Sequence, residues 1–483
     1  MERNLTGKRP SFHQEPHKTS IYRVMVLLGL IIVATWILLS IRRGEIISPL
    51  LPTSTPTRMS VSYFLEAEAY FQAGKLDDPA NATPGPGVPK INDSIDAYKA
   101  ALEGDPQNAA AWAELARIQA YSSSMLRNDT ERRVRLEQAL ESANKAVELA
   151  PDDSAVRAIR AFVLDWYAFN PLVLAAQRED LLVEAEREAS RSFQLDPQNA
   201  LALAYYAEIL ADEQKWTQAE KYAVQAIALG PDLMDTHRVY GYVLETLGKY
   251  NAAIQQYQEA VRINPNMTFL YIRIGQNFRE GIRNSDRALD YFDRAAKINQ
   301  GLGVQNPLPY IEIARTYMQI GQFFAASINA EKALELDPTN ANTYGQLGII
   351  FRRARNYEGA MILLKCAVRG CIAAENEMGK MDVVGLPLTS ITVAYYYVEY
   401  GTNLAFLSRP NENYCEEAFA VLGEVRASYQ SEPTLMGIIE DSEGICYRLA
   451  GELKPGTNET PAGLPGATST TQAMNFMAAT PTP

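Results

Sequence analysis

The sequence predicts an all-helical protein: a solenoid of antiparallel helix pairs preceded by one membrane-spanning helix. From about Val61 onward, apolar residues recur with helical spacing between short turns, and no stretch alternates as a strand does. Small residues and prolines in this part repeat with a period of 34 residues. Near the N-terminus, Val24–Ile41 is 18 residues long and uncharged. With 47% apolar and 21% charged residues, the chain can bury a large core.

Residues 1–23 form a basic leader, and residues 24–41 are the expected transmembrane segment, bounded by Arg23 and Arg42–Arg43. At 1.5 Å per residue, the segment just spans a hydrocarbon core about 30 Å thick. Two arginines follow it directly, without the small residues of a cleavage site, which favours an uncleaved signal anchor over a signal peptide. A buried helix of a soluble domain is the alternative, but the segment is apolar on every face.

Charge predicts the direction of this anchor. Five Lys or Arg residues precede the segment and two follow it, so the positive-inside rule places the N-terminus in the cytoplasm. We therefore expect a single-pass protein of the cell membrane that contacts the lipid bilayer through Val24–Ile41 and has its body outside the cytoplasm. Residues 42–60 contain three prolines among Ser and Thr, a composition that suits an extended spacer.

The body occupies residues 61–450 and is most regular over 198–372. In the clearest block, Tyr206–Ala207 is followed after 12 residues by Ala219, after seven more by Ala226 and after five more by Pro231. The block that begins at Tyr240–Gly241 keeps these intervals, and so does the block at Ile313–Ala314. The block at Leu347–Gly348 keeps them too, with isoleucine where the proline would fall. The block at Ile274–Gly275 is one residue looser.

The spacing has a physical reason. A Gly or Ala in the first helix and an Ala in the second let two helix axes approach within about 8–10 Å, and proline ends the second helix. These residues together resemble the tetratricopeptide repeat family, whose period is 34 residues. The resemblance implies a right-handed superhelix whose concave groove binds a protein or peptide.

Other parts of the body depart from the period. Insertions are expected at 77–90, 120–135 and 166–180, as loops on one face of the solenoid. Residues 373–450 diverge, although Ala394–Leu407 and Tyr414–Val425 fit a ninth pair and Leu435–Leu449 a closing helix. Residues 451–483 are rich in Thr and Pro and are expected to form a disordered tail.

Composition argues against catalysis and against nucleic-acid binding. Two of the three histidines lie in the leader, so His237 alone remains in the body, where we interpret it as a packed residue. No phosphate loop, nucleophile elbow or zinc-protease motif occurs, so we expect no enzymatic activity, cofactor or metal. Residues 44–483 carry a net charge of −17, whereas nucleic-acid binding needs clustered Lys and Arg.

The four cysteines all lie in the last quarter of the chain: Cys366, Cys371, Cys415 and Cys446. In an oxidising compartment they allow two disulfides with three connectivities, and four buried thiols are the alternative. A regular helix would hold Cys366 and Cys371 too far apart to bridge, but Gly370 could break the helix. A bond between Cys415 and Cys446 would join neighbouring helices of the divergent region.

The family resemblance also assigns the groove, which the first helix of each pair would line. The matching slots are Arg238, Tyr242, Glu245, Gln276, Arg279, Arg315, Met318, Gln346 and Arg352. Arginine predominates, and it would favour an acidic or carboxylate-bearing peptide. Ordinary solvated helix charges are the alternative for any one of these residues.

The expected function is therefore a membrane-tethered extracytoplasmic scaffold or adaptor that binds other proteins. Two alternatives remain open. The chain could be a non-catalytic subunit of a membrane enzyme or secretion complex, or a structural cell-surface component that self-associates. A homo- or hetero-oligomer is compatible with each.

Overall fold

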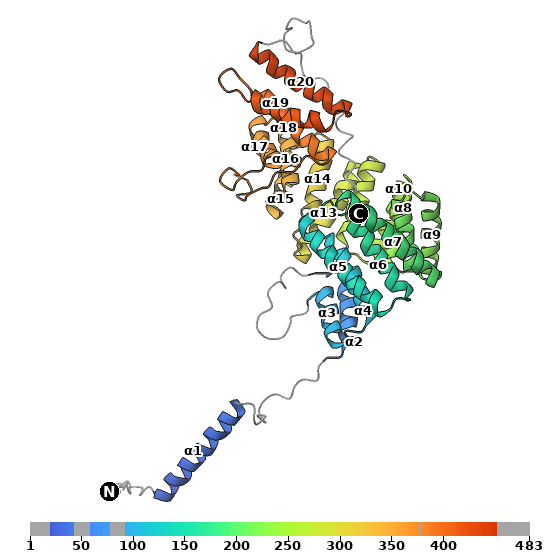
Figure 1. Ribbon diagram of the computed structural model, residues 1–483, viewed down its shortest axis with the longest axis vertical. Coiled ribbons are helices and arrows are strands. Elements are labelled where there is room, and N and C mark those ends of the chain that lie inside the picture. The colour runs from blue at the N-terminus through green and yellow to red at the C-terminus, as the bar shows by residue number, and fades with distance from the viewer. Residues whose placement is uncertain (1–19, 43–57, 78–91, 377, 452–483) are drawn as a thin grey trace, which may run out of the picture. The chain divides into compact units, whose positions relative to one another are not determined.

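The computed structural model describes residues 20–42, 58–376 except 78–91, and 378–451 (Figure 1). The leader up to residue 19, most of the spacer, most of the first insertion and the tail from 452 lie outside the described residues. The chain divides into two compact units, Met1–Arg58 and Met59–Pro483. Each unit is considered by itself below.

The first unit contains helix α1 (Ile21–Arg42), which covers the expected transmembrane segment. Side chains are described from Ile21 to Trp36 and at Leu39, and all of them are exposed. Counting only described residues, no helix is both long and apolar enough to cross a membrane. The membrane anchor therefore stays a prediction.

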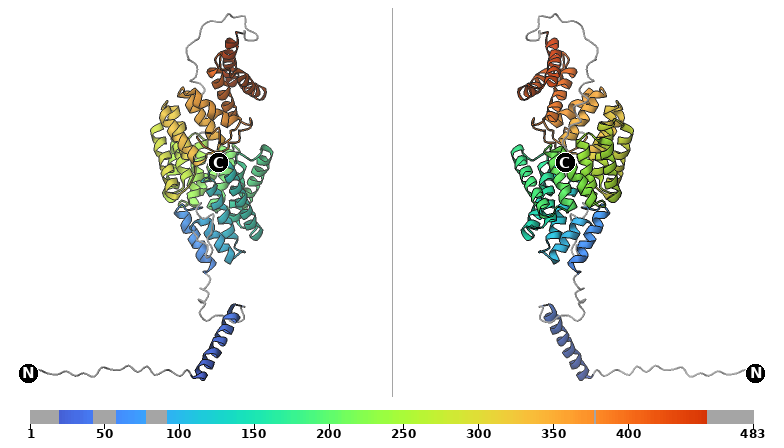
Figure 2. Two further views of the ribbon diagram at one scale, coloured as in Figure 1. Left: turned by 90° about the vertical axis from the view of Figure 1, so that its left-hand side faces the viewer. Right: turned by 90° about the vertical axis from the view of Figure 1, so that its right-hand side faces the viewer.

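The second unit is a helical solenoid, as predicted. Over the described residues of this unit, consecutive helices pack as nine hairpins followed by a closing helix. Figures 1 and 2 show the helices stacked one after another. The helices are α2 (Ser60–Gln72), α3 (Ser94–Gly104), α4 (Ala109–Ser123), α5 (Asp129–Leu149), α6 (Ser154–Ala168), α7 (Ala175–Leu195), α8 (Ala200–Asp212), α9 (Trp216–Leu229), α10 (Met234–Thr246), α11 (Tyr250–Ile263), α12 (Thr268–Gln276) with the π-turn η2 (Asn277–Gly281), α13 (Ser285–Leu302), α14 (Leu308–Gln319), α15 (Phe323–Leu336), α16 (Ala341–Arg353), α17 (Tyr357–Val368), α18 (Ile391–Leu407), α19 (Cys415–Ser428) and α20 (Pro433–Ala450).

Small residues bring the helices of each pair together. A Cβ atom added to Gly275 of α12 would lie 2.4 Å from the Phe292 ring of α13, closer than any real contact. An added Cβ on Gly348 of α16 would meet Leu364 of α17 at 2.6 Å in the same way. The predicted role of the Gly and Ala positions is confirmed, because the partner side chain occupies the space of the missing Cβ.

The prolines that end the second helices have a recurring partner. At four junctions, a side chain of the next first helix donates a hydrogen bond to the proline carbonyl six residues earlier: Trp112 to Pro106, Arg157 to Pro151, Tyr271 to Pro265 and Tyr344 to Pro338. His237 occupies the same slot, with Nε2 2.9 Å from the Pro231 carbonyl and Nδ1 2.8 Å from Gln256 Oε1. Both ring nitrogens thus have structural partners at the helix junction, consistent with a packed residue.

The second and third pairs are longer chiefly because their helices are longer. Helices α5 and α7 have 21 residues each, against 14 in α9, and α4 and α6 have 15 each, against 13 in α8. The prediction of loop insertions at 120–135 and 166–180 was wrong for most of the added residues. Seven residues are about two helical turns, so the longer second helices keep their buried face toward the array.

The cysteines pair as Cys366–Cys371 and Cys415–Cys446, with Cα–Cα distances of 4.8 and 5.6 Å. Helix α17 ends at Val368, and Gly370 has φ +80°, in the left-handed region that favours glycine. The chain turns there and brings Cys371 back to Cys366. The second bond joins α19 to α20, the last two helices of the array.

We expect the two disulfides to differ in their effect on stability. Removing the Cys415–Cys446 bond by substituting both cysteines with serine should cost about 3–4 kcal/mol, because it closes a loop of 31 residues in the unfolded chain. The Cys366–Cys371 bond spans only five residues, and its removal should cost about 2 kcal/mol. Urea unfolding followed by circular dichroism measures both. A larger loss from the Cys366–Cys371 variant would contradict the expectation.

Candidate functional site: the inner face of the solenoid

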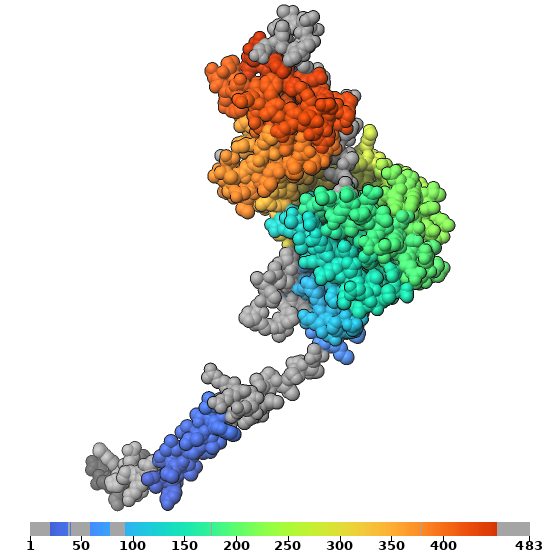
Figure 3. Space-filling model, in the orientation of Figure 1, coloured from blue at the N-terminus to red at the C-terminus, as the bar shows by residue number. Residues whose placement is uncertain are grey.

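The first part of the solenoid curls until its turns touch. Asn266, between α11 and α12, donates from Nδ2 to the Ala73 carbonyl after α2 at 2.7 Å, and Asn306 donates to the Ser124 carbonyl after α4 at 2.7 Å. A Cβ added to Gly74 would lie 2.2 Å from the Cβ of Asn266. Residues from Ala67 to Ile313 consequently share one core, whereas the later helices have cores of their own. Figure 3 shows these later helices, in orange and red, as a second mass.

The curl buries a network of charged and aromatic side chains that come from the first helix of several pairs. Arg238 of α10 donates two hydrogen bonds of 2.6 Å to Glu208 of α8. Arg117 of α4 lies 3.0 Å from Asp235 at the start of α10, which also accepts hydrogen bonds from Tyr121 and Tyr205. These six side chains belong to residues at most 7% exposed. The Arg238 guanidinium also lies over the rings of Tyr121, Phe162 and Trp166.

The electrostatics of this interior follow from burial and pairing. Burial raises the pKa of Asp235, but Arg117 and Arg238 outweigh this effect and hold the pKa below its ordinary value. For Asp212 at the end of α8, nearby charges and hydrogen bonds offset less of the effect of burial. Burial is the largest influence on it and raises its pKa to about 7, although it accepts a hydrogen bond from Tyr242. Burial raises the pKa of the neighbouring Asp165 well above its ordinary value, and the charge of Asp212 adds to this.

Five of the expected groove residues lie within this curl: Arg238, Tyr242 and Glu245 on α10, Gln276 on α12 and Arg279 on η2. Arg238 does not line an open groove, contrary to prediction, because the curl buries it against Glu208. Tyr242 donates to Asp212, and Glu245 lies 3.1 Å from Arg273. The sequence placed these residues correctly on the first helix of a pair, but it did not predict that the opposite side of the superhelix closes over them.

From Gln276 onward, the expected residues follow one another along α12, η2, α14 and α16, and all of them except Met318 form a polar ladder. Gln276 donates to Glu312 at 3.2 Å, and Arg279 and Arg315 both lie beside the same carboxylate. Further along, Arg315 donates to Gln346 at 3.2 Å. Arg352 of α16 contacts Glu399 of α18, and Met318 of α14 packs against both later cores. Arg279 and Gln346 are buried, whereas Arg315, Met318 and Arg352 are partly exposed.

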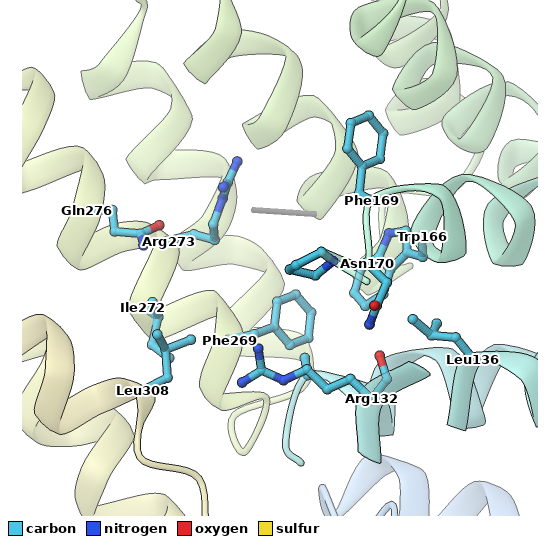
Figure 4. Close-up of a pocket in the computed structure, with 13 residues that line it drawn as sticks. Arg132, Leu136, Trp166, Phe169, Asn170, Phe269, Ile272, Arg273, Gln276 and Leu308 are labelled. Atoms are coloured by element: carbon cyan, nitrogen blue, oxygen red, sulfur yellow. The ribbon is translucent and has the colours of Figure 1, made fainter. Parts of the chain in front are cut away.

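A pocket that the sequence did not predict opens beside the buried network (Figure 4). Its volume is about 110 Å³, and its lining comes from α4, α5, α6, α12, the connection 169–174 and the start of α14. The wall is mostly apolar, with Leu136, Trp166, Phe269, Ile272 and Leu308. A signal was present in the sequence: the connection reads FNPLVL and carries apolar residues where a solvent loop would carry polar ones.

Comparison with known proteins supports the interpretation of the repeat. Models of the tetratricopeptide repeat match residues 207–268, 309–340 and 329–361. Anaphase-promoting complex subunit 3 of Schizosaccharomyces pombe is 25% identical over 166 residues, which are 34% of this chain and 24% of that protein. The chain therefore spans about a quarter of the length of this curated relative.

Two solved structures align with parts of this chain. The APC/C hetero-tetramer Cut9-Hcn1 has a TM-score of 0.46 and 15% identity, over 69% of this chain and 54% of that chain. Yeast Tom70 has a TM-score of 0.43 and 14% identity, over 81% of this chain and 91% of that chain. The repeat models match on both sides of the change of core near residue 314. The chain therefore contains tetratricopeptide repeats, arranged in an all-α helical solenoid.

Proposed function

We propose that this protein is a membrane-tethered scaffold that binds a protein partner along the inner face of its later repeats. The observation that carries the proposal is the polar ladder on α14, α16 and α18. Arg315 shares Glu312 with Arg279, while Arg352 and Arg353 both contact Glu399. Three arginines thus face two carboxylates on these helices, a basic excess in a chain whose net charge is −12.

This excess favours an acidic partner. Guanidinium groups that already share a carboxylate keep free N–H donors, and a second carboxylate can take these donors with charge-assisted hydrogen bonds. The side chains of Arg315, Arg352 and Arg353 are 12–17% exposed, so their edges can be reached without unfolding the helices. The relative in Schizosaccharomyces pombe is named as a subunit of a complex, which agrees with a role in assembly.

The tether and the compartment are part of the proposal. Val24–Ile41 is uncharged, and the described side chains of α1 expose apolar groups on all sides, as a helix embedded in lipid would. Disulfides persist outside the cytoplasm, and two are formed here. Both features support a cytoplasmic N-terminus and an extracytoplasmic body.

Site-specific photo-crosslinking tests the partner surface. With p-benzoylphenylalanine at Met318 of the full chain in native membranes, we expect an adduct with a protein partner. Arg353→Glu should reduce this adduct at least tenfold, because it adds a carboxylate where an acidic partner would bind. Arg262→Glu is the matched control, since Arg262 lies on α11 with its side chain 63% exposed. Equal adducts in both variants would contradict the proposal. An adduct from p-benzoylphenylalanine at the exposed Phe324 of α15, without one at Met318, would contradict it as well.

Fractionation tests the tether separately. The full chain should remain in the membrane pellet after carbonate extraction, and protease added outside should digest the body. Replacing Leu28 and Ile32 by Arg places two charges in the apolar segment and should release the chain into the soluble fraction. Replacing Leu65 and Val61, exposed residues of α2, should not. A native chain that carbonate extracts would refute the anchor.

A further inference from the structure

The connection that lines part of the pocket between α6 and α12 also exposes apolar side chains. Leu172 is 43% exposed and Leu174 is 75% exposed, and both lie in the connection 169–174 beside Asn170 and Pro171, which line the pocket. This connection belongs to the lengthened third pair. Exposed leucines beside an apolar opening lose contact with water when a larger molecule covers them, which favours binding there.

The walls determine the size and kind of group that fits. The rings of Trp166 from α6 and Phe269 from α12 both line the pocket and meet edge to face, with centroids 6.0 Å apart. Leu136, Ile272 and Leu308 add aliphatic surface. The volume of about 110 Å³ is somewhat below that of an engineered apolar cavity of about 150 Å³ that binds benzene. One aromatic ring or one branched aliphatic side chain is therefore the appropriate size.

The charged residues among the described lining residues are all basic. Arg132 and Arg273 line the pocket, and no carboxylate is among its described lining residues. Each guanidinium pairs with a carboxylate outside the lining: Arg132 with Asp129 at 3.1 Å and Arg273 with Glu245 at 3.1 Å. Arg132 also donates two hydrogen bonds of 3.3 Å to the Leu126 carbonyl. The Asp129 side chain is 43% exposed, so its hold on Arg132 is weakened by solvent. In Figure 4 the Arg132 guanidinium points toward the side of the pocket formed by Phe269 and Ile272.

We propose that this pocket receives one aromatic or branched aliphatic side chain of a protein partner that carries an acidic residue next to it. The apolar side chain fills the space between Trp166, Phe269 and Leu308. The acidic group accepts hydrogen bonds from Arg132, and the partner's backbone covers Leu172 and Leu174. This inference rests on the proposed scaffold function and gives it a second, specificity-determining contact, separate from the polar ladder on α14, α16 and α18.

Short blocked peptides test the pocket on the purified full chain. The probes are acetyl-Phe-Glu-amide, acetyl-Phe-Lys-amide and acetyl-Ala-Glu-amide, titrated by isothermal calorimetry. We expect the first to bind at least tenfold more tightly than either of the others, because only it supplies both the ring and the carboxylate.

Two variants locate the binding. Leu308→Trp should fill the pocket and weaken acetyl-Phe-Glu-amide at least tenfold, whereas Leu336→Trp, at the equally half-buried end of α15, should leave it unchanged. Arg132→Glu should reverse the preference so that acetyl-Phe-Lys-amide binds more tightly. A loss of structure alone would weaken both probes and would not exchange their order. Arg262→Glu is the control for a distant charge reversal.

The outcomes separate this inference from the scaffold proposal. Equal binding of all three probes, no binding, or an unaltered preference in Arg132→Glu overturns the pocket assignment. If the Met318 adduct nevertheless forms, the scaffold proposal stands without the pocket. If the probes follow the expected order while no adduct forms at Met318, the pocket assignment stands and the inner face of the later repeats is not the partner surface.

Discussion

Replacing Glu208 by Ala is expected to lower the free energy of unfolding by about 3–5 kcal/mol, because it leaves the buried Arg238 guanidinium without its carboxylate. Both side chains are 5% exposed, so water cannot replace the three lost hydrogen bonds, two from Arg238 and one from Trp166 Nε1. Urea unfolding measures the effect through the shift in midpoint, with the slope checked for a change in cooperativity. Trp166 fluorescence reports on this region directly, since Arg238 lies 5.6 Å from its ring.

A double variant separates the penalty of an unpaired buried charge from the net contribution of the ion pair to stability. Glu208→Leu combined with Arg238→Met removes both charges and keeps apolar volume, so its stability should lie close to that of the native chain. Glu259→Ala, which breaks the exposed pair with Arg262, serves as the control and should give no measurable change. If Glu208→Ala were as mild as Glu259→Ala, the pair would not be buried in solution and the curl would be open.

The local repeat was predictable from the sequence because it depends on contacts between neighbours. Gly275 against Phe292, and proline at the end of α11, act within a single helix pair, and their spacing shows in the chain. The closing helix was predictable for the same reason: Leu435–Leu449 lies within α20. Such features require no knowledge of how the array curves.

The curl was not predictable, because it results from small rotations that accumulate from pair to pair. Arg117 and Asp235 are 118 residues apart, and each looks like an ordinary charge on an amphipathic helix. The sequence therefore assigned Arg238 to an open groove, while the structure places it inside the closed turn. The pocket was missed for the same reason, since its lining comes from α5 and α6 on one side and α12 on the other.

The lengthened helices could have been recognised. Residues 129–149 and 175–195 contain neither Gly nor Pro, so nothing in them ends a helix. The prediction of loops followed the family's habit instead of the local composition. The polar ladder on the later repeats was placed on the right helices, but its pairing with Glu312 and Glu399 requires three-dimensional neighbours.

Asp212→Asn is expected to stabilise the protein at pH 7.5 by about 2–4 kcal/mol and to have little effect near pH 4. The pKa of Asp212 is raised to about 7 in the fold, chiefly by burial, from an ordinary value near 3.8. Between these values the folded state holds a proton that the unfolded state has released. Stability must therefore fall as the pH rises from about 4 to 7, and asparagine removes this dependence because it does not titrate.

The comparison of the two proteins separates Asp212, together with its neighbour Asp165, from the other buried carboxyl groups. Burial also raises the pKa of Asp165. The pKa values of Asp235 and Glu312 lie below their ordinary range because arginines outweigh burial, so the stability that these two carboxylates contribute is lost only at acid pH. Subtracting the variant's urea midpoints from the native ones at each pH removes most of the contributions of Asp235 and Glu312. The contribution of Asp165 stays in the difference, because the charge of Asp212 raises the pKa of Asp165. Asp180→Asn on the exposed face of α7 gives the baseline. A difference curve that is flat between pH 4 and 7.5 would mean that Asp212 is ionised in the folded state throughout, and that water reaches the end of α8 inside the curl.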